Sequence, residues 1–430
     1  MTGDVPRGMS PAIFNLIMKK MLEAVAAPES WEQFYKYKTE LICSGQFVKE
    51  LREFIDRRGF ERVCESIAAG EPFPLPRRSV ISKLSTGKKR TVYVYPPDEN
   101  MVLKLLTYLL LRKYDHLFSD NLYSFRPGRS AKDAVRRLLR EGAGNGTLFA
   151  YKVDIHNYFN SIPIDRLVPM LGQCIDDDPE LLTFLRSLLE NPHVYDRGNI
   201  ISEEKGIMAG TPVSSFYANV YLRELDAYFE SRGIIYARYS DDIIVFGSTL
   251  EETEQYAAVI RSFLELSGLS VNPDKEDFFA PEDGWVFLGF SVKGGTVDIA
   301  PATVLKLKHK MRRKANSLAR WAKRNGVDGK RAATAFIRIF NRKLLEGPKD
   351  SRDNEFTWSY WFFSVITTAD SLKVIDNYAQ ECIRFIASGK HTKARFDLRY
   401  DDMKALGYRN LVHAYYEYSR DEAEPQEPLS

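Results

Sequence analysis

Two adjacent aspartates carry the sharpest chemical signal in this sequence. Asp241 and Asp242 lie between two apolar runs, residues 234–238 and 243–246, so the pair is expected at the tip of a β-hairpin. Neighbouring carboxylates repel each other, and a fold that holds them together usually has a cation to bind. Taken alone, however, an acidic pair in a turn is more often simply solvated.

A third acid changes this balance. Asp154 ends the apolar run 148–153, so its carboxylate is expected at the edge of a sheet. Three oxygen ligands without His or Cys companions suit Mg²⁺ or Mn²⁺, which accept substrate phosphates as further ligands. This is the chemistry of phosphoryl or nucleotidyl transfer, in which two ions about 3.5 to 4 Å apart activate a hydroxyl and stabilise the leaving oxygen.

The segments around these acids predict a mixed architecture. Residues 11–70 have helical periodicity, which the cluster Pro72, Pro74 and Pro76 ends. Residues 77–94 then indicate a basic hairpin, and helix resumes over 101–118. The middle of the chain alternates strand and helix signals up to a short strand pair near 287–299, so we expect an α+β or mixed α/β fold rather than an all-helical one.

Charge is segregated along the chain. The 430 residues include 61 Lys+Arg and 58 Asp+Glu, a net charge of only +3. Between residues 303 and 345, however, fourteen Lys/Arg face the single acid Asp328. A basic helical face is usually just solvated, but so strong a bias favours a helical segment that grips a polyanion.

Several classes of protein are excluded at this point. The four cysteines are far apart in the sequence, which suggests neither a disulfide framework nor a zinc site. Apolar runs such as 105–111 are far below the roughly 20 residues of a membrane helix, and no secretory signal precedes them. We therefore expect a cytoplasmic protein without a membrane partner.

Several ordered motifs resemble those of one known family. Residues 153–159 (VDIHNYF) and 239–242 (YSDD) resemble two motifs of reverse transcriptases. The motifs between and around them match in the same order: 88–90 (KKR), 123–130 (YSFRPGRS), 206–219 (GIMAGTPVSSFYAN), 268–275 (GLSVNPDK) and 284–289 (GWVFLG). The resemblance covers roughly residues 75–300 and is to the bacterial, group II intron-like branch.

This resemblance implies a right-hand polymerase of α+β class, with an antiparallel sheet and helices in fingers and palm and a helical thumb and C-terminal domain. The expected divisions are a helical N-terminal extension over 1–74, fingers and palm over 75–300, a basic thumb over 301–348 and an aromatic-rich helical region over 349–430.

The resemblance also implies roles for single residues. Asp154 and Asp241 would be the main metal ligands, with Asp242 as the third acid and the backbone of Ile155 close by. The implied cofactor is Mg²⁺, with Mn²⁺ as an alternative.

Further residues would bind the nucleotide. Phe159 occupies the position whose ring excludes a ribose 2′-OH, although without the motif it would be read as a core aromatic residue. Arg90, helped by Lys83 or Lys88, would clamp the triphosphate; the remaining expected contacts are Ala209, Gly210 and Lys275. Two positions depart from the family: Ala209 replaces a common Gln and Ser215 a common Pro, which leaves the acids intact but could alter fidelity or template choice.

Nucleic-acid contacts are expected from two regions. Those in the fingers are Arg126 and Arg129, and those in the thumb are Lys306, Lys310, Arg313, Lys314 and Arg320. In the aromatic-rich region most rings should be core, but a few could stack on RNA, interleaved with Arg384, Lys390, Lys393, Arg395 and Arg399.

The sequence thus predicts an RNA-directed DNA polymerase whose partners are an RNA template, dNTPs and a DNA product. Because nuclease, integrase and ribonuclease H signatures are not seen, it most resembles the stand-alone, defence-associated reverse transcriptases that copy a structured non-coding RNA. The alternatives are an RNA-dependent RNA polymerase and a reverse transcriptase of a mobile or diversity-generating element. Phe159 is the residue that would distinguish a DNA polymerase from an RNA polymerase. A non-catalytic RNA-binding scaffold is disfavoured because all three acids are present.

Overall fold

The computed structural model of the chain describes residues 20–40, 45–82, 89–203, 206–346, 358–390 and 397–423. These residues form two units. The first extends to residue 143 and continues over 147–281, and the second consists of 144–146 and the residues from 282 onward. Mixed helices and mainly antiparallel sheets confirm the predicted α+β class.

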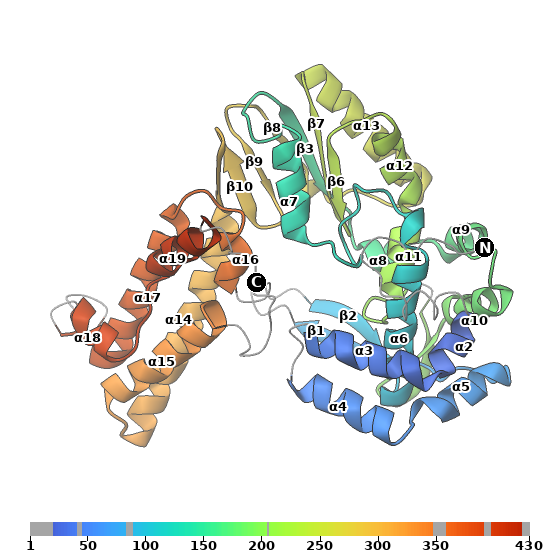
Figure 1. Cartoon of the computed structure of the whole chain (residues 1–430), viewed down its shortest axis with the longest axis horizontal. Helices are drawn as coiled ribbons and strands as arrows, with labels where there is room; N and C mark the ends of the chain where they lie inside the picture. The colour runs from blue at the N-terminus through green and yellow to red at the C-terminus, as the bar shows by residue number, and fades with distance from the viewer. Residues whose placement is uncertain are drawn as a thin grey trace, which may run out of the picture. The chain divides into compact units, whose positions relative to one another are not determined.

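Helices at the N-terminal side of the first unit surround one buried helix (Figure 1). Trp31 fixes their packing, because its ring stacks on Phe60 at 5.2 Å and its Nε1 donates to the carbonyl of Val25. The central helix is apolar on nearly every side, yet neither it nor any other described helix has the length and apolarity of a membrane span. The elements are α2 (Met21–Ala26), α3 (Pro28–Glu40), α4 (Gly45–Asp56), α5 (Phe60–Ala68) and the central α6 (Pro97–Lys113).

The predicted basic hairpin is confirmed. Strands β1 (Arg77–Ser82) and β2 (Lys89–Val94) pair antiparallel, and β1 also meets β4 (His193–Asp196), which pairs with β5 (Asn199–Ser202). The resulting sheet has the order β2-β1-β4-β5.

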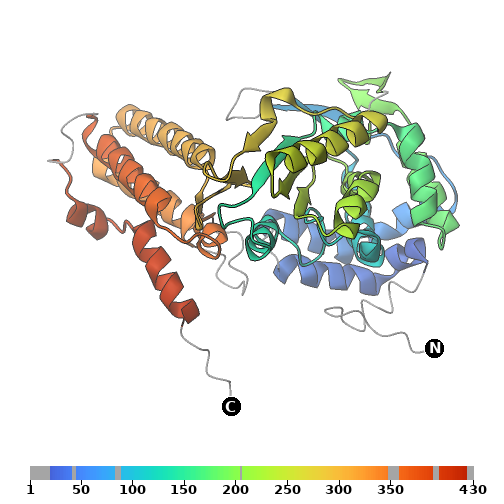
Figure 2. The same ribbon diagram turned by 90° about the horizontal axis from the view of Figure 1, so that it is seen from above.

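A second sheet carries the acids. Its order is β6-β7-β3-β8, entirely antiparallel, and α13 (Leu250–Leu266) packs against β3 and β7, as the yellow-green helix in Figure 2 shows. The strands are β3 (Phe149–Asp154), β6 (Tyr236–Tyr239), β7 (Asp242–Gly247) and β8 (Asp277–Phe279). The other helices of this unit are α7 (Ala131–Arg140), α8 (Tyr158–Ser161), α9 (Ile164–Cys174), α10 (Pro179–Glu190), α11 (Ser214–Tyr221) and α12 (Arg223–Ser231).

The second unit joins a small sheet to a group of helices. Asp298 on β11 accepts hydrogen bonds from the backbone N–H and hydroxyl of Ser371, and Thr367 N–H donates to Val297. These contacts place the sheet with the helices from Glu282 onward, whereas the sequence prediction divided the chain at residue 301. The elements are β9 (Trp285–Phe287), β10 (Phe290–Lys293), β11 (Thr296–Ile299), α14 (Pro301–Asn325), α15 (Gly329–Leu344), α16 (Trp358–Phe363), α17 (Asp370–Ser388), α18 (Tyr400–Ala405) and α19 (Leu411–Ala423).

Candidate active site

The acidic pair lies at the predicted hairpin tip. Tyr239 pairs with Asp242 across β6 and β7, so Ser240 and Asp241 form a two-residue loop. Ser240 adopts a left-handed conformation with φ +61°. Its backbone N–H donates to the hydroxyl of Ser124 at 2.8 Å, which ties the loop to the segment before α7.

The tertiary structure brings Asp154 to the same place. It is the last residue of β3 and stands in register with Asp242 on β7. The backbone N–H of Ile155 donates to the carbonyl of Asp241 at 3.0 Å. All three predicted acids therefore meet at one end of the sheet.

The surroundings of Asp241 and Asp242 disfavour the charged form of their carboxyl groups. Burial, followed by the charges of Asp241 and Asp154, raises the pKa of Asp242 to about 6. Burial likewise raises the pKa of Asp241, with a contribution from Asp154. A neighbouring positive charge favours the ionised form of carboxylates that are buried together in this way.

Lys275 supplies part of that charge. Its Nζ lies 2.5 Å from Oδ2 of Asp154, and its side chain is 56% exposed against 8% for the aspartate. Asn272 donates from Nδ2 to Oδ1 of the same carboxylate at 3.2 Å. The predicted nucleotide contact Lys275 is thus beside the acids, where an ammonium occupies one face of Asp154.

The donor set suits a hard divalent cation. The groups at this end of the sheet are carboxylates, and Ile155 can add only its carbonyl oxygen because its N–H is bound to Asp241. In the part of the chain that the structure describes, however, no three His, Cys, Asp or Glu side chains form a ready-made metal cage. Coordination by Asp154 through Oδ2 requires Lys275 to move away.

Phe159 lies on α8, five residues after Asp154 in the sequence. It is half-buried, whereas the neighbouring Tyr158 is fully buried and donates its hydroxyl to the carbonyl of Ala218. The core aromatic of this segment is therefore Tyr158. The ring of Phe159 meets the ring of Phe125 edge to face, with 6.3 Å between centroids and 89° between planes.

The loop over residues 206–210 packs beneath Phe159. A Cβ on Gly206 would lie 2.3 Å from the carbonyl oxygen of Phe159, and a Cβ on Gly210 would lie 3.1 Å from Cβ of Val92. Both glycines have positive φ, +54° and +103°, which other residues rarely adopt. Glycine is thus required where this loop touches α8 and β2.

Ala209 differs from its expected role. Its side chain is buried, its backbone N–H donates to the side-chain oxygen of Asn160 at 3.3 Å, and its carbonyl accepts from the backbone N–H of Tyr93 at 2.9 Å. The prediction that Ala209 contacts the nucleotide is therefore not supported, because both of its backbone groups are used to join α8 to β2.

Arg90 remains available for a phosphate. It is exposed on β2 and, two residues before Val92, lies on the face of the strand that meets Gly210. Its proposed helpers, Lys83 and Lys88, lie outside the described residues.

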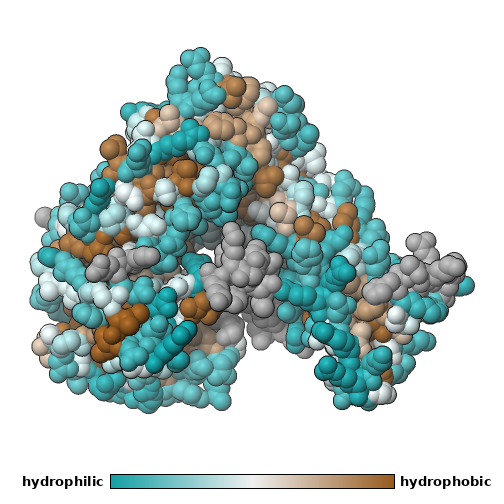
Figure 3. Space-filling model, turned by 180° about the vertical axis from the view of Figure 1, so that it is seen from behind, coloured by the Kyte–Doolittle hydropathy of each residue, from teal (hydrophilic) through white to brown (hydrophobic). Residues whose placement is uncertain are grey.

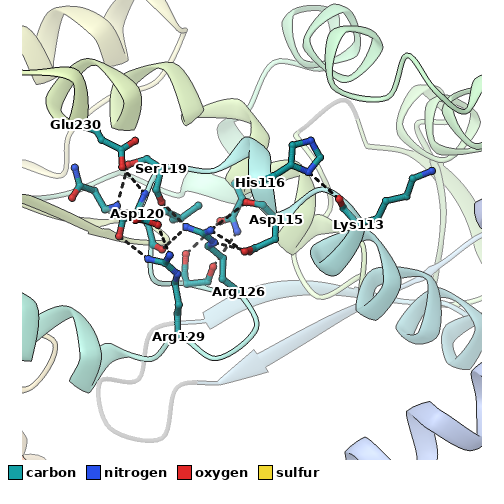
Figure 4. Close-up of polar contacts among 12 residues, drawn as sticks. Lys113, Asp115, His116, Ser119, Asp120, Arg126, Arg129 and Glu230 are labelled. Atoms are coloured by element: carbon teal, nitrogen blue, oxygen red, sulfur yellow. Dashed lines mark hydrogen bonds and ion pairs between the residues drawn. The ribbon is translucent and has the colours of Figure 1, made fainter. Parts of the chain in front are cut away.

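The structure corrects the prediction for Arg126. Its side chain is only 3% exposed, and Nε and Nη2 donate to the two carboxylate oxygens of Asp115 at 2.7 and 3.0 Å. Nη1 donates to the carbonyls of Ser119 and Leu122 (Figure 4). A guanidinium so fully engaged is not free to bind nucleic acid; it holds the loop that carries Ser124.

Arg129 is more accessible. It pairs with the carboxylate of Asp120 and donates to its carbonyl at 2.8 Å, but 27% of its side chain is exposed (Figure 4). Its predicted contact with nucleic acid remains compatible with this geometry.

The predicted thumb cations all lie on the exposed part of α14. Buried residues of this helix are Val304, Met311, Ala315 and Ala322, which form one narrow stripe. The five exposed predicted cations are Lys306, Lys310, Arg313, Lys314 and Arg320. Asp328, the lone acid of the segment, caps α15 by accepting from the N–H groups of Lys330 and Arg331.

Sequence reasoning missed a buried charge pair behind the acids. Arg238 on β6 and Asp226 on α12 are both fully buried and joined by two hydrogen bonds of 2.8 and 2.6 Å. The signal was present, because an arginine inside an apolar strand next to Tyr239 must have a partner. The spacing of residues along the sequence did not identify Asp226 as that partner.

Comparison with known proteins finds a family model that matches the part of the chain that carries these motifs. Residues 81–292 match the family model described as reverse transcriptase (RNA-dependent DNA polymerase). An uncharacterised 91 kDa protein of a cob intron in Schizosaccharomyces pombe is 29% identical over 40% of this chain and 21% of its own length. The group II intron-encoded protein LtrA of Lactococcus lactis is 26% identical over 39% of this chain and 28% of its own.

A third relative is matched over more of its length. Protein YkfC of Escherichia coli is 23% identical over 52% of this chain and 68% of its own. Our chain therefore spans about a fifth of the cob intron protein and about two thirds of YkfC.

Solved structures that resemble the chain include telomerases. Telomerase from Candida albicans, solved with a fragment of telomeric RNA, has a TM-score of 0.45 at 13% identity, over 78% of this chain and 62% of that one. Apo telomerase from Candida tropicalis, truncated from its C-terminal domain, has a TM-score of 0.42 at 13% identity over 53% and 55%.

Proposed function

Since residues 81–292 of this chain are a reverse transcriptase domain, we propose that the protein is an RNA-directed DNA polymerase. The observation that carries the proposal is the register of Asp154 opposite Asp242, with Asp241 in the adjoining turn. In this assignment, residues 75–300 are fingers and palm, 301–348 the thumb and 349–430 a C-terminal region.

We assign the binding of divalent metal, Mg²⁺ or Mn²⁺, to Asp154, Asp241, Asp242 and the carbonyl of Ile155. When bound, such ions would favour attack by a primer 3′-hydroxyl on the α-phosphate and stabilise the departing pyrophosphate. Burial supports this role, since together with the charges of Asp241 and Asp154 it raises the pKa of Asp242 to about 6, and a nearby cation would favour the ionised form. Lys275 forms an ion pair with Asp154.

The surrounding residues would position the nucleotide. Arg90, exposed on β2, offers a planar donor fork for the triphosphate. The half-buried ring of Phe159 would block a ribose 2′-hydroxyl, which favours dNTPs over rNTPs. Gly210 would form the floor on which the incoming base pair rests.

Template and product would be held by charge rather than by sequence. Five exposed cations of α14 are suited to phosphates of a duplex, because Lys and Arg release counterions on binding without reading bases: Lys306, Lys310, Arg313, Lys314 and Arg320. Arg129 would add a contact in the fingers.

The test is primer extension on an RNA template with dNTPs and Mg²⁺. The double variant Asp241→Asn, Asp242→Asn should reduce incorporation to background. Asp277→Asn is the matched control, because this carboxylate lies on the neighbouring strand β8 and pairs with Lys152. Equal incorporation by wild type and the double variant would refute the site, and incorporation of rNTPs alone would favour an RNA-dependent RNA polymerase.

The finer assignment rests on the resemblance of the motifs. We propose that the template is a structured non-coding RNA and that DNA synthesis serves antiphage defence in the cytoplasm. Sequencing the RNA that co-purifies with the chain should give one dominant species, and phage plating should fall in cells with the wild type but not with the Asp241→Asn variant. A broad mixture of co-purifying RNAs, together with equal phage plating on cells with and without the wild-type protein, would contradict this assignment.

A further inference from the structure

The second unit contains a polar cavity of about 920 Å³ that the proposed polymerase chemistry does not use. Residues of α14 and α17 line it, together with Lys390, Arg399 and Tyr400. We propose that this α14–α17 cavity binds a single-stranded segment of RNA. The proposal rests on the polymerase function and identifies a second place where the same protein would hold its RNA.

Charge is the first reason. Four cations line the cavity against the single acid Glu381, namely Arg312, Arg384, Lys390 and Arg399. They come from separate elements, so the helical period of α14 alone does not bring them together. Convergence of cations on a concave surface attracts a polyanion more strongly than the same charges spread over a convex one.

Not all of these cations are equally available. Lys390 lies 3.2 Å from both carboxylate oxygens of Asp397, and Arg384 donates to the carbonyl of Leu398 at 3.2 Å. These two residues therefore shape the wall. Arg312 is exposed on α14 and has no ion pair with an acid of the described chain, which makes it the cation best placed for a phosphate.

Aromatic rings and amides complete the lining. Tyr378 and Tyr400 both line the cavity and are half-buried, so each presents part of its ring. Nζ of Lys308 lies 4.7 Å from the ring centroid of Tyr378 and fixes that ring from the α14 side. Rings of this kind stack on bases, and the lining amides Asn316 and Gln380 can hydrogen-bond base edges or 2′-hydroxyls.

The cavity is separate from the exposed cations assigned to the duplex. Arg312 and Arg313 are consecutive, so they lie about 100° apart around α14. A pocket of this volume can receive one or two splayed nucleotides but not a double helix, whose grooves and backbone need a longer surface. Hydrophilic residues also gather over the lower part of this unit, at the right of Figure 3, which is unlike an apolar protein-docking face.

The experiment uses the full-length chain, saturated with a short primer–template duplex so that the active site is filled. Binding of a labelled, unstructured 12-nucleotide RNA is then followed by fluorescence anisotropy. Arg312→Glu and Tyr378→Leu should each weaken RNA binding about fivefold or more. Arg338→Glu, an exposed arginine of α15 outside the cavity, should leave it within twofold.

Two controls separate this inference from the proposed function. Incorporation of dNTPs on the short duplex should be unchanged in the cavity variants, whereas Asp241→Asn should abolish incorporation and keep RNA binding. Unchanged affinity in both Arg312→Glu and Tyr378→Leu would overturn the cavity assignment, as would equal binding of a DNA strand of the same sequence. Photocrosslinking of wild type to 4-thiouridine RNA, which needs no variant to fold, should label α17, and labelling confined to other segments would refute it.

Discussion

Arg238 and Asp226 form a fully buried ion pair directly behind the turn that presents Asp241 and Asp242, with Nη2 and Oδ2 2.6 Å apart. The same guanidinium donates from Nη1 to the carbonyl of Ser240 at 3.3 Å, inside that turn. The hydroxyl of Tyr236 donates a hydrogen bond to Oδ1 of Asp226 at 3.0 Å. The position of the acidic turn therefore depends on charges that never touch solvent.

Substitution of Arg238 should damage both stability and activity. Arg238→Met leaves the carboxylate of Asp226 buried without its partner, which should cost about 3 to 5 kcal/mol of the free energy of unfolding. We expect a lower urea midpoint and strongly reduced primer extension. The control is Arg186→Met, which breaks an exposed pair with Glu190 on α10 and should cost less than about 1 kcal/mol. Equal losses for the two variants would contradict this account.

Phe159 should determine the choice between deoxyribonucleotides and ribonucleotides. Phe159→Ala removes the ring at the proposed 2′ position and should lower discrimination against rNTPs by about 10- to 200-fold, measured as the ratio of kcat/KM for dNTP and rNTP. If discrimination were unchanged while dNTP incorporation persisted, the 2′ assignment would be wrong.

Phe125 should act on the same discrimination by positioning the ring of Phe159. It has a left-handed backbone with φ +61°, is 40% exposed, and contacts Phe159 edge to face. Phe125→Leu should weaken discrimination less than Phe159→Ala does, and Phe125→Tyr, which keeps the ring, should retain it. A loss in both Phe125 variants, or in neither, would argue against the ring contact as the cause.

Arg126 should matter for folding rather than for RNA affinity. Arg126→Ala removes the hydrogen bonds that Arg126 donates to the carboxylate of Asp115 and to the loop that carries Ser124. We therefore expect a lower melting temperature. Arg129→Ala, which is part-exposed, should instead weaken RNA binding with little change in melting. Thermal unfolding and anisotropy on both variants check this, and the opposite pattern would restore the original prediction for Arg126.

The exposed cations of α14 should set the salt dependence of duplex binding. The double variant Lys306→Gln, Lys310→Gln should reduce the slope of log affinity against log salt by up to about 2, since each phosphate contact contributes about 0.9. Lys36→Gln, Lys49→Gln removes two exposed lysines of the N-terminal helices and should leave the slope unchanged. Identical slopes in wild type and the α14 variant would exclude this helix from the grip.

Much of the local structure was predictable. The basic hairpin, the strand that ends at Asp154, the tip that carries Asp241 and the helical character of the basic segment all follow from local periodicity, turn residues and charge. Such signals lie within a few residues of each other along the chain, so they can be read without knowing the fold. The division of the chain was less predictable, because β9–β11 join the second unit through contacts to residues about 70 positions away.

By itself the sequence determined which residue types could do the chemistry: three carboxylates in recognisable motifs, an aromatic residue after the first, and a strongly basic helix. Only the tertiary structure decided which of the named residues are free to act. It buried Arg126 against Asp115, engaged both backbone groups of Ala209, and paired Arg238 with Asp226. The physical reason is that burial and hydrogen-bond partners arise from contacts between segments that are distant in sequence. The sequence alone does not distinguish a charged side chain at the surface from one in the core.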